Sequence, residues 1–359
     1  MVMKTLLSII FSLGAIVIIC TSPGCESTSY SAQGLRVTGK VGEILVVCEE
    51  GIWNTEIKNQ LDTGLTQFIM PYLPDVVTFE LIHRTPNKFE HGIKRYRNVL
   101  FINIDPEFKG DHGTIELRED VWAETQLVID INGKDFNQVL TTCKKGLDEI
   151  HEKFEAKDWG RIMGRFASLP NPRVDKLIKK TFGIKIDLPD GAVIVTERKN
   201  FYRVEFPASS RPIDFGEGGQ DAGTIFSGVM LYQYDYIDSS QFAFKNLLNA
   251  RDTMLKYNVP SEIEGMYMGT QYVDYVFPEG NDVQSADGKI DGYEMRGMFK
   301  FVGNGKFGTG GAFWAYHFVH PKKKKLICIS GYVDAPPTTS WTHPLREVQA
   351  VLRSVELAP

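Results

Sequence analysis

Cys25 is the residue whose surroundings most clearly predict a chemical modification. It follows Gly24 and a short apolar segment, residues 6–19. That segment is short for a membrane span but has the length of a secretory signal core. A lipoprotein signal needs a small residue directly before the acylated cysteine, and Gly24 meets this need. We therefore expect a signal peptide at residues 1–24 and acylation of Cys25. The alternatives are an ordinary secretory peptide and an uncleaved anchor.

Acylation would make the membrane the first partner of this chain. Each buried methylene contributes about 0.8 kcal/mol, so two or three acyl chains anchor a protein firmly. Residues 25–40 show little apolar periodicity, and we expect them to form a flexible tether. The predicted location is the cell envelope, at the outer membrane and facing the periplasm.

Residues 282–294 resemble the second half of a calcium-binding loop. Gly288, Asp291 and Glu294 match positions six, nine and twelve of such a loop, but position one is Val283. The flanking segments are strand-like instead of helical. We expect a polar hairpin loop here, with a calcium-stabilised element as the alternative.

The remaining cysteines and the paired histidines favour structural roles. Cys48, Cys143 and Cys328 lie within apolar patterns, and we expect buried free thiols there. His317 and His320 lie on an expected strand, where residues three apart point to opposite faces and cannot share one metal ion. We predict no catalytic, cofactor-binding or metal-binding residues, and no cofactor.

Four polar residues in the second half are candidates for a binding patch or a buried polar network. They are Arg251, Asp252, Tyr267 and Arg296. An arginine inside an alternating strand usually needs a partner, which can come from the protein or from a ligand.

The composition is that of an ordinary globular protein of 359 residues, with 43% hydrophobic and 24% charged residues. The 40 basic and 45 acidic side chains give a net charge of -5. Such a balance offers no broad basic surface, so we expect no nucleic-acid partner.

The helices and strands expected from the sequence indicate an α+β fold in two domains. In residues 41–181, apolar strands such as 44–48 alternate with helices at 135–154 and 159–166, which indicates a two-layer α/β sandwich. Residues 182–359 show mainly alternating strands and two helices, at 240–257 and 344–355. This pattern indicates a mainly antiparallel sheet module with two helices.

Several short motifs, in this order, resemble one known family. They lie at residues 42–47, 97–100, 251–252, 264–268, 293–297 and 331–336. Together they resemble an uncharacterised envelope-lipoprotein family of Gram-negative bacteria, a domain of unknown function, over about residues 39–359. The resemblance implies a location in the cell envelope and a size for the protein, but it implies no enzymatic reaction.

The function expected from these observations is binding or assembly in the cell envelope, with envelope proteins as possible partners. The alternative is an envelope hydrolase that acts on glycan or peptide through carboxylates not yet identified. A deep cleft with facing carboxylates would favour the hydrolase, whereas a shallow, aromatic-rich surface would favour binding.

Overall fold

A computed structural model describes residues 34–69, 76–214, 220–285, 288–304, 309–335 and 341–358. The expected signal peptide and Cys25 lie outside these residues. The end of the expected tether does not: Thr38 donates its backbone N–H to the carbonyl of Arg95 at 2.8 Å and accepts from Arg97. Paired backbone therefore begins before residue 41.

The first sheet, here called the N-terminal sheet, has the strand order β2-β1-β3-β5-β4. The pairs among β2, β1, β3 and β5 are parallel, and β4 joins β5 in the antiparallel direction. The inner strands are continuous apolar runs because a parallel sheet is buried on both faces. The strands are β1 (Glu43–Val47), β2 (Glu80–Arg84), β3 (Asn98–Ile104), β4 (Thr114–Glu119) and β5 (Leu127–Gly133).

Helices α1 (Glu50–Trp53), α2 (Glu56–Leu65) and α3 (Phe136–Ser168) belong to this half, together with the 3-10 helices η1 (Pro86–Lys88) and η2 (His91–Arg95). Apolar residues of α2 and α3 pack on β1, β3 and β5 in one buried cluster. Asp135 caps α3 by accepting a hydrogen bond from the backbone of Gln138.

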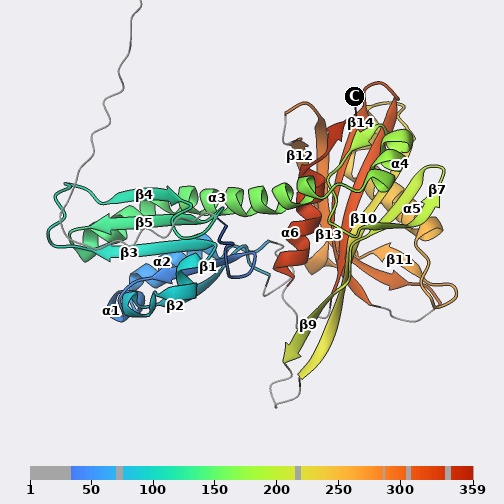
Figure 1. Cartoon of the computed structure of the whole chain (residues 1–359). Helices are drawn as coiled ribbons and strands as arrows, with labels where there is room; N and C mark the ends of the chain where they lie inside the picture. Colours follow the sequence, from blue (N-terminus) through green and yellow to red (C-terminus); the bar gives the residue numbers. More distant parts are fainter. Residues whose placement is uncertain are drawn as a thin grey trace, which may run out of the picture. The chain divides into compact units, whose positions relative to one another are not determined.

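Figure 1 shows α3 as one continuous helix, so the prediction of two helices at 135–154 and 159–166 was wrong. The four residues between them lack glycine and proline, and the sole poor helix former among them, Asp158, is held by ion pairs with Arg97 and Arg161. Phe154 belongs to the core of the N-terminal sheet, whereas Trp159 belongs to another buried cluster. One helix therefore contributes to two cores.

The second sheet, here called the C-terminal sheet, has the order β11-β13-β14-β15-β10-β8-β7, with β12 paired to β13 and β9 to β10. All of these pairs are antiparallel. The strands are β7 (Val193–Arg198), β8 (Phe201–Glu205), β9 (Ser209–Asp214), β10 (Gln220–Asp235), β11 (Tyr267–Thr270), β12 (Glu279–Gln284), β13 (Asp291–Val302), β14 (Gly310–His320) and β15 (Lys325–Asp334). A separate short pair joins β6 (Ile184–Lys185) to β16 (Glu356–Leu357).

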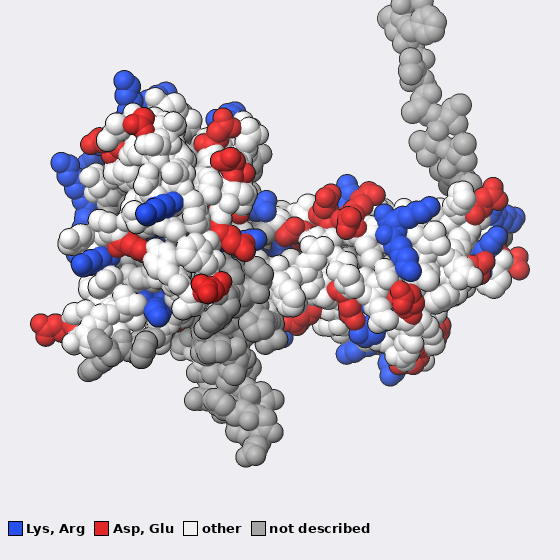
Figure 2. All heavy atoms as spheres, turned by 180° about the vertical axis from the view of Figure 1, so that it is seen from behind, with Lys and Arg blue, Asp and Glu red and all other residues white. Residues whose placement is uncertain are grey.

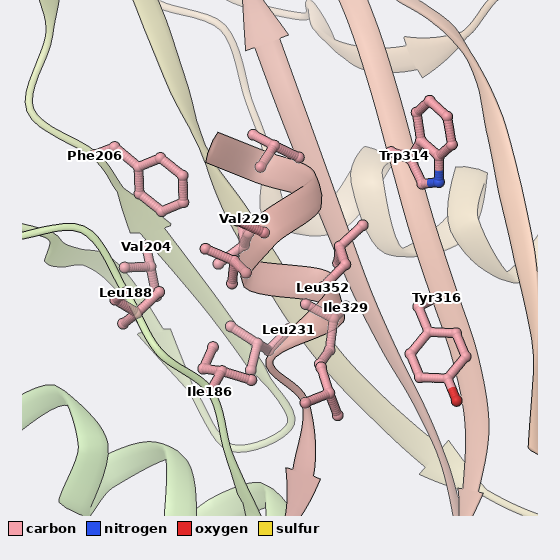
Figure 3. Packing of buried hydrophobic residues seen from close by; sticks show 14 of the residues in the cluster. Ile186, Leu188, Val204, Phe206, Val229, Leu231, Trp314, Tyr316, Ile329 and Leu352 are labelled. Atoms are coloured by element: carbon pink, nitrogen blue, oxygen red, sulfur yellow. The ribbon is translucent and has the colours of Figure 1, made fainter. Parts of the chain in front are cut away.

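The C-terminal sheet buries both of its faces. Helix α5 (Phe244–Asn258) covers one face, here called the α5 face, which includes Met230, Met295 and Phe313. Helices α4 (Pro172–Phe182) and α6 (Thr342–Arg353), with the end of α3, cover the other, here called the α6 face. Figure 3 shows this second packing, in which side chains of β8, β10, β14 and β15 gather around α6. Two 3-10 helices, η3 (Ser239–Phe242) and η4 (Asp274–Val276), flank α5 and β11 in sequence.

The mixed α+β fold predicted from the sequence is confirmed, with a mixed sheet followed by an antiparallel sheet. Residues 32–359 form one compact unit. None of the helices in the described ranges combines the length and the apolar composition that a membrane-spanning helix requires.

Candidate functional site

Arg251, the first residue of the predicted patch, lies on α5 and is fully buried on the α5 face. Its guanidinium carbon lies 3.7 Å from the centre of the Phe313 ring. None of its three nitrogens has a hydrogen-bond partner among the described residues. Burial lowers the pKa of Arg251, and the nearby Tyr232 acts in the opposite direction. The residue is thus part of the core.

Asp252 and Tyr267 lie near Arg251, where α5 packs on β11. A carboxylate oxygen of Asp252 accepts a hydrogen bond from the Tyr272 hydroxyl, and the other accepts one from the Thr270 backbone at 3.4 Å. Lys256 of α5 places its ammonium 5.9 Å from the ring centre of Tyr267. The side chains of Asp252 and Tyr267 are half-buried, that of Lys256 is exposed, and the contacts just described join them to neighbouring residues of the protein.

Arg296 lies on the opposite face of the sheet from Arg251. Its neighbour Met295 packs on the α5 face, so Arg296 points to the other side of β13. There it pairs with Glu279 at 3.1 Å and stacks on Trp314 at 5.4 Å. The structure therefore brings Arg251, Asp252 and Tyr267 to one region and separates Arg296 from them.

A hollow of about 520 Å³ lies beside α5, away from the residues that the sequence analysis singled out as a binding patch. We call it the tyrosine groove. Its apolar lining comes from β8, β10 and the last turns of α5: Phe201, Tyr232, Tyr234, Met254 and Tyr257. Tyr257 is 67% exposed, although it is a large aromatic residue on a helix. The rings of Tyr232 and Tyr234 are nearly parallel, with their centres 6.4 Å apart.

Amide side chains provide much of the polar lining of the tyrosine groove. These amides belong to Asn200, Asn249 and Asn258. The side chain of Gln233, between Tyr232 and Tyr234 on β10, points to the opposite face of the sheet, where its Nε2 donates to the Thr181 carbonyl at 3.2 Å.

Two cations, Arg198 and Lys199, line the same groove, and among the described residues no carboxylate does. Arg198 donates from one nitrogen to the Tyr257 carbonyl at 2.7 Å and to the Asn258 side chain at 3.1 Å. This contact places positive charge at the C-terminal end of α5, where carbonyl groups are left unpaired. Over the described ranges, neither Arg198 nor Lys199 forms an ion pair.

One sequence signal pointed toward the groove: Tyr232 and Tyr234 are two residues apart and share a strand face. No sequence pattern connects them with Tyr257, because α5 and β10 meet through tertiary packing.

Two other hollows contain carboxylates. One of about 580 Å³ lies between β4 and α3 and includes Asp111, Glu149 and Asp135, the last of which caps α3. Another of about 430 Å³ includes Asp282 and Asp291. Asp175 and Asp334 have carboxyl pKa values raised by burial, and neither residue lines any of these three hollows.

The segment with calcium-loop spacing is a strand hairpin on both sides of residues 286 and 287, which lie outside the described residues. Asp282 pairs with Tyr293, and Gln284 pairs with Asp291 and donates to its carboxylate at 2.8 Å. No group of three or more metal-binding side chains occurs among the described residues.

The two histidines of β14 contact different parts of the molecule. One nitrogen of His317 lies 3.3 Å from the carbonyl of Tyr293, and burial lowers the pKa of His317 to about 4. His320 places Nε2 3.1 Å from the Gly183 carbonyl. Both rings thus take part in the packing around β14.

The prediction of buried free thiols is confirmed for Cys48, Cys143 and Cys328. Burial raises the pKa of each thiol to about 12, which leaves little thiolate at neutral pH. We expect none of the three to react with Ellman's reagent in the native protein, and all three to react in 6 M guanidinium chloride. A thiol that is labelled at once in buffer, and located by mass spectrometry to one of these positions, would contradict the packing described.

Basic and acidic side chains are interspersed over the face shown in Figure 2. This face therefore carries no large field of one sign, as the net charge of -5 also indicates.

Comparison with solved structures gives several similarities of low score. The Saccharomyces cerevisiae Ran-binding protein Mog1p aligns with 12% identity and a TM-score of 0.28, covering 49% of this chain and 90% of that one. LpqN of Mycobacterium tuberculosis, a protein involved in cell envelope biogenesis, aligns with 16% identity and a TM-score of 0.26, covering 49% and 83%. CyanoP of Synechocystis aligns with 9% identity and a TM-score of 0.23, covering 46% and 92%.

No curated protein matches this chain. Two family models do. Residues 37–167 match a domain of unknown function (DUF8532), and residues 171–354 match another (DUF4837). Both descriptions agree with the expectation of an uncharacterised family. Since the second match spans half of the sequence, the chain belongs to the family described as domain of unknown function DUF4837.

Proposed function

We propose that this protein is a lipid-anchored component of the cell envelope, at the outer membrane and facing the periplasm, where it binds an envelope component in the tyrosine groove. The observation that carries this proposal is the groove itself: exposed and half-buried aromatic rings beside amides and two cations, in a shallow hollow whose described lining contains no carboxylate. Hollows of this kind, with an apolar floor and a few polar groups, are typical of ligand sites.

The proposed acyl anchor would help the groove to bind its ligand. A protein held by acyl chains is confined to a surface, which raises its effective concentration toward components of that surface. A shallow groove of modest affinity is then sufficient for binding in the envelope. The binding role is also the one that we expected for an aromatic-rich surface without facing carboxylates.

The test separates the anchor from the groove. The Cys25→Ala chain, produced in a Gram-negative host, is expected to leave the membrane fraction and lack the acyl mass, whereas the wild-type chain keeps both. Purified Cys25→Ala protein is then mixed with washed envelope fragments and sedimented. We expect it to sediment with the fragments, and we expect the added substitution Tyr257→Ala to reduce the bound fraction several-fold.

Tyr272→Ala is the matched control, because Tyr272 is an exposed tyrosine that does not line the groove. An unacylated wild-type protein would refute the anchor. Sedimentation that is the same for Tyr257→Ala and Tyr272→Ala would refute the groove as the binding surface.

A further inference from the structure

We propose that the ligand of the tyrosine groove is a glycan chain that carries negative charges, an inference which rests on the proposed binding function and names its ligand class. The lining supplies three features that such a chain requires: aromatic faces, amide groups and two cations that form no ion pair with the described residues.

The aromatic faces come from two elements that line the groove, α5 and β10. Tyr257 projects from the last turn of α5, and Tyr234 lies on β10 beside the parallel ring of Tyr232. The C–H face of a sugar ring is weakly positive and packs against the negative face of an aromatic ring. The exposed ring of Tyr257 and the half-buried ring of Tyr234 thus offer surfaces on which a sugar ring can pack.

The amides match hydroxyl groups. A sugar hydroxyl both donates and accepts a hydrogen bond, and an amide side chain offers both functions from one group. Asn200, Asn249 and Asn258 supply these amides.

Arg198 and Lys199 indicate that the ligand carries negative charge. Both line the groove, both are exposed, and neither has an ion-pair partner in the described ranges. With no carboxylate in the lining, the groove has a positive field that favours an anionic substituent on the ligand. Carboxylate-bearing sugars supply such a substituent at regular spacing.

A peptide is a poorer match, because β8 and β10 are paired where they line the groove, and the edge strand β7 reaches the groove with Arg198, its last residue. Phe201 pairs with Arg198 on one side and with Tyr232 on the other. Tyr234 pairs with Leu326 of β15 as well, and the Gln233 backbone donates to the Asn200 carbonyl at 3.1 Å. An extended peptide gains most of its affinity by adding a strand to an unpaired edge. Recognition at this groove must therefore use side chains, as glycan recognition does.

The experiment is isothermal titration calorimetry of the full chain, acylated and held in detergent micelles, against three probes. Tetragalacturonate is the anionic glycan, chitotetraose is the neutral glycan, and tetraglutamate is the anionic peptide. We expect tetragalacturonate to bind, with chitotetraose at least about tenfold weaker because it lacks the charge, and tetraglutamate without measurable binding.

Two variants locate the binding. Tyr257→Ala removes one aromatic wall and is expected to weaken tetragalacturonate binding about tenfold or more. Lys199→Gln removes a charge at an exposed position, and it should weaken tetragalacturonate and leave chitotetraose unchanged. Tyr272→Ala and Lys256→Gln serve as matched controls outside the groove and should bind as the wild type does.

The possible failures are distinguishable. If tetragalacturonate does not bind while Tyr257→Ala still releases the protein from envelope fragments, the glycan class is wrong and the binding function stands. Equal binding of tetraglutamate would overturn the glycan in favour of an acidic peptide. Binding of tetragalacturonate that is unaffected by both groove variants would overturn the site.

Discussion

Asp158→Ala is expected to lower the free energy of unfolding by about 3–5 kcal/mol, the range seen when one partner of a buried ion pair is removed. Asp158 is fully buried on α3, at the point where the helix passes from one core to the other. Its carboxylate lies 2.6 Å from Arg161 and 3.5 Å from Arg97, and it accepts a hydrogen bond from the Gly42 backbone at 3.0 Å.

The substitution destabilises the protein because three groups lose the same partner: the guanidinium groups of Arg97 and Arg161 and the backbone N–H of Gly42. Burial lowers the pKa of Arg161 to about 10 although Asp158 acts in the opposite direction, so removal of the carboxylate leaves this buried guanidinium without its counter-charge. The Gly42 N–H also loses its acceptor. Water cannot fully replace these contacts, since both arginine side chains are largely buried.

The measurement is guanidinium chloride unfolding, followed by far-UV circular dichroism and by the fluorescence of tryptophan, including Trp159 beside the substitution. Asp158→Asn keeps an acceptor for Gly42 but removes the charge, and it should recover only part of the loss. Asp148→Ala, on an exposed position of the same helix, should change stability by no more than about 0.5 kcal/mol. A loss below about 1 kcal/mol for Asp158→Ala would mean that the arginines find other partners.

Arg251→Met is expected to stabilise the protein, in contrast to Asp158→Ala: it should raise the free energy of unfolding by about 1–4 kcal/mol. The guanidinium is buried and makes no hydrogen bond with the described residues, so it has lost its hydration without replacement. Its contact with the Phe313 ring contributes about 2 kcal/mol of stabilisation, which is less than the several kcal/mol that desolvation of one ion costs. Methionine fills a similar volume without charge.

Arg346→Met is the matched control, because Arg346 is also buried and also lies over aromatic rings, those of Phe79 and Trp159. Unlike Arg251, it donates to the Thr78 carbonyl at 2.9 Å and lies 3.6 Å from Glu155. The same substitution should therefore destabilise the protein at position 346. If Arg251→Met also destabilises the protein, the Arg251 charge is paired in solution.

The candidate patch shows where reasoning from the sequence reached its limit. Arg251 and Arg296 both stand out as charges within apolar patterns, and such charges need partners. The alternation along β13 correctly separates Met295 from Arg296, but it does not show which face meets which helix. That choice depends on the packing of α5 and α6, which is non-local.

The amino-acid sequence by itself determined the α+β class, most strands of both sheets and the burial of the thiols, because apolar residues with a period of 2 or 3.6 have one stable arrangement locally. It also carries the predicted acylation signal at Cys25, which lies outside the described residues. Only the tertiary structure decided that α3 runs through two cores, that Arg251 is buried without a hydrogen bond to the described residues, and that Tyr234 and Tyr257 line one groove. These features join residues that are distant in the chain, and their energies depend on packing and desolvation that no local pattern encodes.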